Sequence, residues 1–145
     1  MFVRSIVESK QIRQVITVKP EDSVTEAAEI LARHRIGALV VSRDGSSVDG
    51  IISERDIVRA IGTVGVGCMT LPVEDLMTAE VQGCGIYETA MSVIERMTRG
   101  RFRHMPVMED GRMVGVISIG DVVKARIDEI ELENSALTDM ISNSW

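Results

Sequence analysis

Long apolar stretches are missing from this sequence. No apolar run approaches the roughly 18 residues that a membrane-spanning helix requires. The opening segment, residues 1–8, is interrupted by Arg4 and Glu8 too early to form the core of a secretory signal peptide. These absences predict a chain with no membrane partner and a cytoplasmic location.

Cysteine and histidine are also scarce. The chain contains only Cys68, Cys84, His34 and His104 of these two types. Two cysteines with no histidine close in sequence form neither a disulfide framework nor a zinc-ligand set, so we interpret both as structural thiols and expect no metal site. No Ser-His-Asp set, activated lysine or nucleophile elbow can be assembled from the sequence either. We therefore expect a protein that is not an enzyme.

Basic residues are outnumbered by acidic ones. The sequence has 16 Lys and Arg against 22 Asp and Glu, a net charge of −6 and a pI near 4.9. Such a chain repels polyanions, so no nucleic-acid partner is expected. With 145 residues, 45% of them hydrophobic, the chain fits one compact domain that buries roughly two-thirds of its unfolded surface.

The sequence does contain an internal repeat. The segment GIISERDIV, which starts at Gly50, recurs as GVISIGDVV 65 residues later, counting from Gly50 to Gly115. In each copy an apolar, β-prone run leads to a serine and, three residues on, to an aspartate, as expected where a buried strand meets a capped helix. Upstream of the turn that precedes this segment the offset is 66, because that turn is one residue shorter in the second copy. One buried helical face is copied with that offset, so that Val24, Ala27, Ala28 and Leu31 correspond to Ala90, Val93, Ile94 and Met97.

The patterns predict a β-α-β-β-α unit that occurs twice. In the first copy we expect a strand over 15–18, a helix from the capping box at Ser23 to Arg35, strands over 38–42 and 48–52, and a helix over 54–61. A unit of about 60 residues has little core of its own, so the two copies should pack together. The predicted fold is α/β (α+β-like): two β-α-β-β-α repeats related by a pseudo-two-fold axis, plus a C-terminal helix. Two equivalent clefts are expected where the repeats meet, and ligands favour such interfaces.

The expected organisation has five parts. They are an N-terminal helix within 1–14, a first repeat over 15–61, a linker over 62–78, a second repeat over 79–126 that opens with a strand over 81–84, and a helical tail over 127–145. The glycines of 62–67 do not follow the G-x-G-x-x-G order, so a linker is favoured over a phosphate-binding loop. After Pro72 a short acidic helix is expected over 73–77.

Several of these segments are typical of one known family. They are the two Gly-x-x-Ser-x-x-Asp segments, Thr17-Val18 before Pro20, Met105-Pro106-Val107 before the Asp110-Gly111 turn, and Arg101-Phe102-Arg103-His104. With them the chain resembles a tandem pair of cystathionine-β-synthase (CBS) domains, a Bateman module, and in particular the stand-alone bacterial CBS-pair proteins.

The serine and aspartate of the repeated motif have two interpretations. Ser53 and Ser118 can act as helix N-caps, answered by Asp56 and Asp121 at the third helical position. The resemblance implies a second role, in which each carboxylate accepts hydrogen bonds from the ribose hydroxyls of an adenine nucleotide (AMP, ATP or NAD(H)). In that role the serine hydroxyl and the free N–H groups of the helix face phosphate. The geometry permits both roles.

The resemblance also implies that each cleft draws on both repeats. Mapped onto this chain, one cleft combines Ser53 and Asp56 with Thr78, Gln82 and Arg103. The other combines Ser118 and Asp121 with Ile12, Ile16, Ile36 and Gly37.

Positive charge is unevenly distributed between the two expected clefts. Arg55, Arg103 and His104 are candidates to neutralise ligand phosphates, whereas a solvated basic face is the alternative interpretation. Because Gly37 and Ala38 stand where the second repeat has Arg103 and His104, one cleft is expected to hold fewer cationic groups.

The tail carries a heptad-like apolar seam. Its members alternate by four and three and include one asparagine: Ile127, Ile130, Asn134, Leu137 and Ile141. The tail either packs back on its own domain or forms a dimer contact in which Asn134 helps to fix the register. Bateman modules commonly pair, so the resemblance implies a homodimer.

Two classes of function follow. The favoured one is a non-enzymatic sensor, in which an adenine nucleotide bridges the two repeats and biases their packing. The alternative is a structural or protein-interaction module that has degenerate ligand clefts and works through its dimer face.

Overall fold

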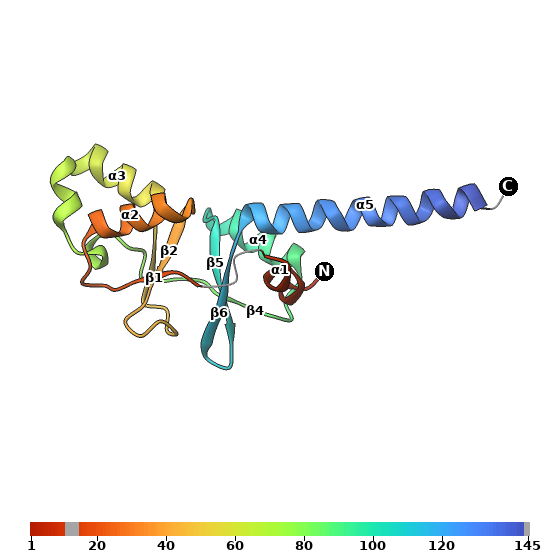
Figure 1. The fold of residues 1–145 in the computed structure, drawn as a ribbon, viewed down its shortest axis with the longest axis horizontal. Coiled ribbons are helices and arrows are strands. Elements are labelled where there is room, and N and C mark those ends of the chain that lie inside the picture. The colour runs from red at the N-terminus through yellow and green to blue at the C-terminus, as the bar shows by residue number, and fades with distance from the viewer. Residues whose placement is uncertain (11–14, 144–145) are drawn as a thin grey trace.

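The computed structural model describes residues 1–10 and 15–143, which form two small α/β units and one long helix (Figure 1). The first unit contains β1 (Thr17–Val18), α2 (Val24–His34), β2 (Ala38–Val41), β3 (Gly50–Ser53) and α3 (Glu54–Val64). The second unit contains β4 (Cys84–Gly85), α4 (Ala90–Gly100), β5 (His104–Glu109), β6 (Arg112–Ser118) and α5 (Ile119–Asn143). The predicted α/β fold, with two β-α-β-β-α repeats and a C-terminal helix, is confirmed.

Each unit is built on a three-stranded sheet. In the first, β1 is parallel to β2 and β2 is antiparallel to β3, and β4, β5 and β6 repeat this arrangement. Leu39 pairs with Ile52, and the corresponding pair in the second sheet is Met105 with Ile117. All four side chains are buried, so both sheets present the same apolar face to their helices.

The first strand of each repeat is shorter than predicted. In place of the expected strands over 15–18 and 81–84 the structure has two-residue strands: β1 keeps residues 17 and 18, whereas β4 begins at Cys84 and ends at Gly85, one residue beyond the predicted end. Val15 and Ile16 leave the sheet to line one cleft between the units, and Val81 lines the other.

The segment that joins the two units is more ordered than a linker. Helix α3 continues past the predicted end at residue 61 to Val64 and ends at Gly65, whose φ of 90° favours glycine. Two short 3-10 helices follow, η1 (Val66–Thr70) and η2 (Val73–Asp75), the second replacing the predicted acidic helix over 73–77.

Each unit has a hydrophobic core that a segment from outside the unit completes. Helix α1 (Val3–Ser9) precedes the first unit but buries Val3 and Ile6 in the core of the second. In the same way η2 buries Val73 in the core of the first unit. The backbone contacts also match, since Val3 N–H donates to the Glu88 carbonyl at 2.8 Å and Val73 N–H donates to the Asp22 carbonyl at 2.7 Å.

Among the described residues, the tail contacts its own domain only at its start, where Glu129 pairs with the Met1 ammonium at 2.9 Å, so packing back along its whole length is wrong. Helix α5 is continuous over 25 residues and extends well beyond both units (Figure 1). Val122 is buried near its start, but in the seam Ile130 and Leu137 are 40% and 57% exposed. The reason is that α1 and α4 already complete the core of the second unit, which leaves the tail nothing to cover. Of the helices in the described ranges, none combines the length and apolar character needed to span a bilayer.

Candidate functional site

Two clefts lie between the units. The first has a volume of about 510 Å³ and the second about 360 Å³. The first gathers the predicted residues Ser53, Arg55, Asp56, Thr78, Gln82, Arg103 and His104. The second gathers the predicted residues Ile16, Ile36, Gly37, Ser118 and Asp121. Ile12, also predicted for the second cleft, lies outside the described residues.

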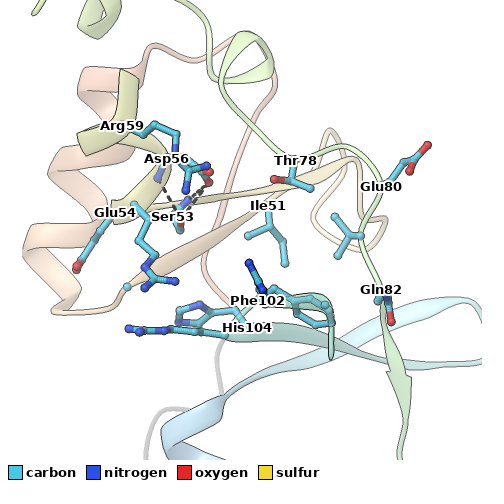
Figure 2. A pocket seen from close by; sticks show the side chains of 16 residues that line it. Ile51, Ser53, Glu54, Asp56, Arg59, Thr78, Glu80, Gln82, Phe102 and His104 are labelled. Carbon is cyan, nitrogen blue, oxygen red and sulfur yellow. Dashed lines mark hydrogen bonds between the residues drawn. The ribbon is translucent and has the colours of Figure 1, made fainter. Parts of the chain in front are cut away.

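The repeated serine and aspartate form reciprocal helix caps in both repeats. The Ser53 N–H and hydroxyl donate to Oδ2 of Asp56 at 2.8 and 3.0 Å, and the Asp56 N–H donates to the Ser53 hydroxyl oxygen at 3.3 Å (Figure 2). Ser118 and Asp121 exchange the two corresponding backbone-to-side-chain bonds at 2.9 and 3.1 Å. The capping interpretation of the motif is therefore correct.

Capping leaves one oxygen of Asp56 available. Both bonds from Ser53 end on Oδ2, and between described residues no hydrogen bond ends on Oδ1. The carboxylate is thus oriented by the cap while its second oxygen can accept from a ligand hydroxyl. The Ser53 hydroxyl proton, by contrast, already serves the cap.

A strand-like contact positions one wall of the first cleft. Thr78 and Ile51 exchange two backbone hydrogen bonds, at 3.0 and 2.8 Å, so the chain after η2 runs along the free edge of β3. Glu80 and Gln82 follow on this segment (Figure 2). The contact explains how Thr78, from the expected linker, comes to line the same cleft as Asp56.

The apolar side chains that line the first cleft include Ile51 and Phe102. Ile51 belongs to β3 and Phe102 precedes β5, so each repeat supplies one of them (Figure 2). Phe102 also packs against the core of the second unit. A half-buried aromatic ring held by a core is a rigid surface on which a flat ligand ring can stack.

The two clefts differ in charge. Four arginines and three carboxylates line the first, namely Arg55, Arg59, Arg101, Arg103, Glu54, Asp56 and Glu80. The second holds Lys10, Arg35 and Asp121. The sequence patterns did not predict Lys10, Arg35, Arg59 or Arg101 as cleft residues, although Arg35 and Arg101 are related by the repeat offset of 66.

Asp121 is already paired with a cation. Lys10 donates to Oδ2 of Asp121 at 2.9 Å and to the Val116 carbonyl at 2.7 Å. Burial raises the pKa of the Asp121 carboxyl, but the hydrogen bonds from Lys10 and Ser118 outweigh burial and leave that pKa below its ordinary value. The carboxylate is therefore charged at neutral pH and bound to the ammonium.

His104 separates the two clefts and lines both of them. Its ring faces Gly37, where an added Cβ would lie 3.4 Å from the imidazole. Burial lowers the pKa of His104, and the opposing effect of Asp121 does not restore it. The imidazole is uncharged at pH 7, so the arginines supply the positive charge of the first cleft.

Arg35 and Arg101 have the left-handed backbone conformation in which glycine is common. They cap α2 and α4 with φ of 53° and 57°, and each lines a cleft. Both arginines therefore stand at a helix C-terminus that borders a cleft.

Arg101→Gly is expected to stabilise the fold and weaken ligand binding in the first cleft. Relief of the left-handed strain exceeds the entropy cost of glycine by about 0.5–1 kcal/mol. Thermal unfolding and calorimetric titration would measure the two effects. Arg99→Ala, which removes the same charge from α4 outside the cleft lining, is the control. A loss of stability in Arg101→Gly would contradict the strain argument.

Fold and clefts together define a tandem repeat module with two clefts between its halves. The family model that describes the CBS domain matches residues 3–63 and 73–128. The chain therefore belongs to the CBS-domain family.

Individual relatives agree with this assignment. The structure of a CBS-domain-containing protein from Agrobacterium tumefaciens is 45% identical, with a TM-score of 0.82, over 87% of this chain and 99% of that one. The chain is also 36% identical to CBSX3, a CBS-domain-containing mitochondrial protein of Arabidopsis thaliana, over 86% of its own length but only 63% of that protein. A third relative is the CBS domain pair of protein MJ0100, solved in complex with 5′-methylthioadenosine and S-adenosyl-L-methionine. It is 27% identical, with a TM-score of 0.76, over 89% of this chain and 98% of that one.

Proposed function

We propose that this protein is a non-enzymatic regulatory module that binds an adenine nucleotide, AMP, ATP or NAD(H), between its two repeats. The observation that carries the proposal is the first cleft. There the cap holds Asp56 with one oxygen available, in a cleft that the Phe102 ring and four arginines also line. The Asp56 carboxylate can accept hydrogen bonds from the ribose hydroxyls, and the Phe102 ring can stack on the adenine. The arginines can pair with the phosphates.

The chemistry of a relative supports the adenosine part of the ligand. The MJ0100 pair was solved with two compounds that contain adenosine. Neither compound carries a phosphate, whereas the first cleft here is lined by four arginines. A phosphate-bearing ligand therefore suits this chain better.

Calorimetric titration of nucleotide-free protein with AMP, ATP, NAD⁺ and NADH would test the proposal. We expect at least one of them to bind with a Kd in the micromolar range, roughly −8 kcal/mol. Absence of binding below about 1 mM for all four, about −4 kcal/mol, would contradict it.

We also propose that the protein is a homodimer in which the tail contributes. Val58 on α3 is 68% exposed, and its repeat counterpart Val123 on α5 is 42% exposed, so both units present apolar helix surface. The seam of α5 prolongs this surface beyond the second unit. A second copy would cover the seam with an identical one.

Leu137→Ala is expected to weaken the dimer, because Leu137 lies in the seam. Leu132→Ala removes the same atoms from a residue that is 72% exposed and lies off the seam, so it serves as the control.

Because residues 127–143 carry five carboxylates and no Lys or Arg, added salt should strengthen the dimer by screening the repulsion between the two tails. Sedimentation velocity would measure both effects. Equal weakening by the two substitutions would exclude the seam as the contact.

A further inference from the structure

Lys10 reaches from the end of α1 into the second cleft. Its ammonium group contacts both the Asp121 carboxylate and the Val116 carbonyl. The side chains of Lys10 and Asp121 are 30% and 28% exposed, so the pair is largely shielded from solvent. The burial of Val3 and Ile6 fixes α1 and thereby keeps the lysine in place.

The motif aspartate of the first cleft has no corresponding ammonium partner among the described residues. Among the ion pairs of the described residues none involves Asp56.

We infer that Lys10 is an internal occupant of the second cleft that confines adenine-nucleotide binding to the first. The inference rests on the proposed function and specifies which of two similar clefts performs it. The ion pair with Lys10 determines whether the motif aspartate is available to a ribose. Each chain then binds one nucleotide.

Lys10 makes Asp121 a poorer acceptor for a ribose hydroxyl. The bonds from Lys10 and from the Ser118 N–H both end on Oδ2, but the ammonium also neutralises the charge of the carboxylate, and their ion pair has a Coulomb attraction that a neutral hydroxyl donor lacks. Lys10 is also part of the same chain, so no association entropy is lost when it pairs. A ligand that displaced the ammonium would in addition break its bond to the Val116 carbonyl.

The number of AMP molecules bound per chain tests this inference, measured by calorimetry on nucleotide-free protein with ATP and NAD⁺ in parallel. The wild-type chain should bind one. Lys10→Met removes the ammonium but keeps most of the apolar stem, and it should bind two, the second within about tenfold of the first. The double variant Lys10→Met/Asp121→Ala should return to one.

Two results would overturn the inference: two molecules bound to the wild-type chain, or one bound to Lys10→Met. The proposed function fails in a different way, when neither protein binds any of the three nucleotides. The ion pair also has a measure that needs no nucleotide, the pKa of Asp121 followed by NMR. That pKa should rise in Lys10→Met, and an unchanged value would show that Lys10 does not occupy the carboxylate.

Discussion

Asp56→Ala is expected to weaken nucleotide binding by about tenfold to a hundredfold, because charge-assisted hydrogen bonds contribute roughly 1.5–3 kcal/mol. The free oxygen of Asp56 is the acceptor that the proposal assigns to the ribose hydroxyls. Calorimetric titration would give the affinity. Thermal unfolding with and without nucleotide would give an independent measure, since a ligand that binds only the folded state raises its melting temperature.

The loss of a helix cap must be separated from the loss of a ligand contact. Asp56 also accepts the Ser53 N–H, so its removal costs the fold about 1 kcal/mol. Thr89→Ala is a matched control because Thr89 caps α4, accepting from the Ser92 N–H at 3.2 Å, and lines neither cleft. If both variants lost affinity equally, the effect of Asp56→Ala would be one of stability, and the ribose role would be wrong.

The repeat is the reason that so much of the architecture could be predicted. A doubled Gly-x-x-Ser-x-x-Asp at a fixed offset requires two similar strand-to-helix junctions, and the structure has both. Periodicity also located the buried faces of α2 and α4, since Ala27 and Val93 are fully buried. These features depend on local sequence, which is where pattern arguments are strongest.

The exchange of packing segments between the units could not be predicted in this way. Val3 and Ile6 show an amphipathic pattern, but the pattern is the same whichever unit the helix covers. Only the three-dimensional path of the chain brings α1 to the second core and η2 to the first. Lys10 was missed for the same reason, because its partner Asp121 is 111 residues away in sequence.

The tail shows a similar limit. A heptad pattern indicates which side of a helix is apolar, and it does not specify what covers that side. Packing back would have required an open core in the second unit, and α1 fills that core. The exposure of Leu137 therefore follows from the same exchange that places Lys10 in the second cleft.

Gly50→Ala is expected to destabilise the fold by about 2–3 kcal/mol, near the upper end for overpacking. A methyl group there would lie 2.6 Å from the Met77 sulfur and 2.8 Å from the Thr78 carbonyl oxygen, and a backbone atom cannot move aside cheaply. Gly115→Ala is the repeat-matched control. Its methyl would meet only the Val7 side chain, at 3.2 Å, and should cost less than about 1 kcal/mol. Urea unfolding would measure both. The contact between β3 and the Thr78 segment forms one wall of the first cleft. Equal losses of unfolding free energy in the two variants would mean that this contact is looser than the structure shows.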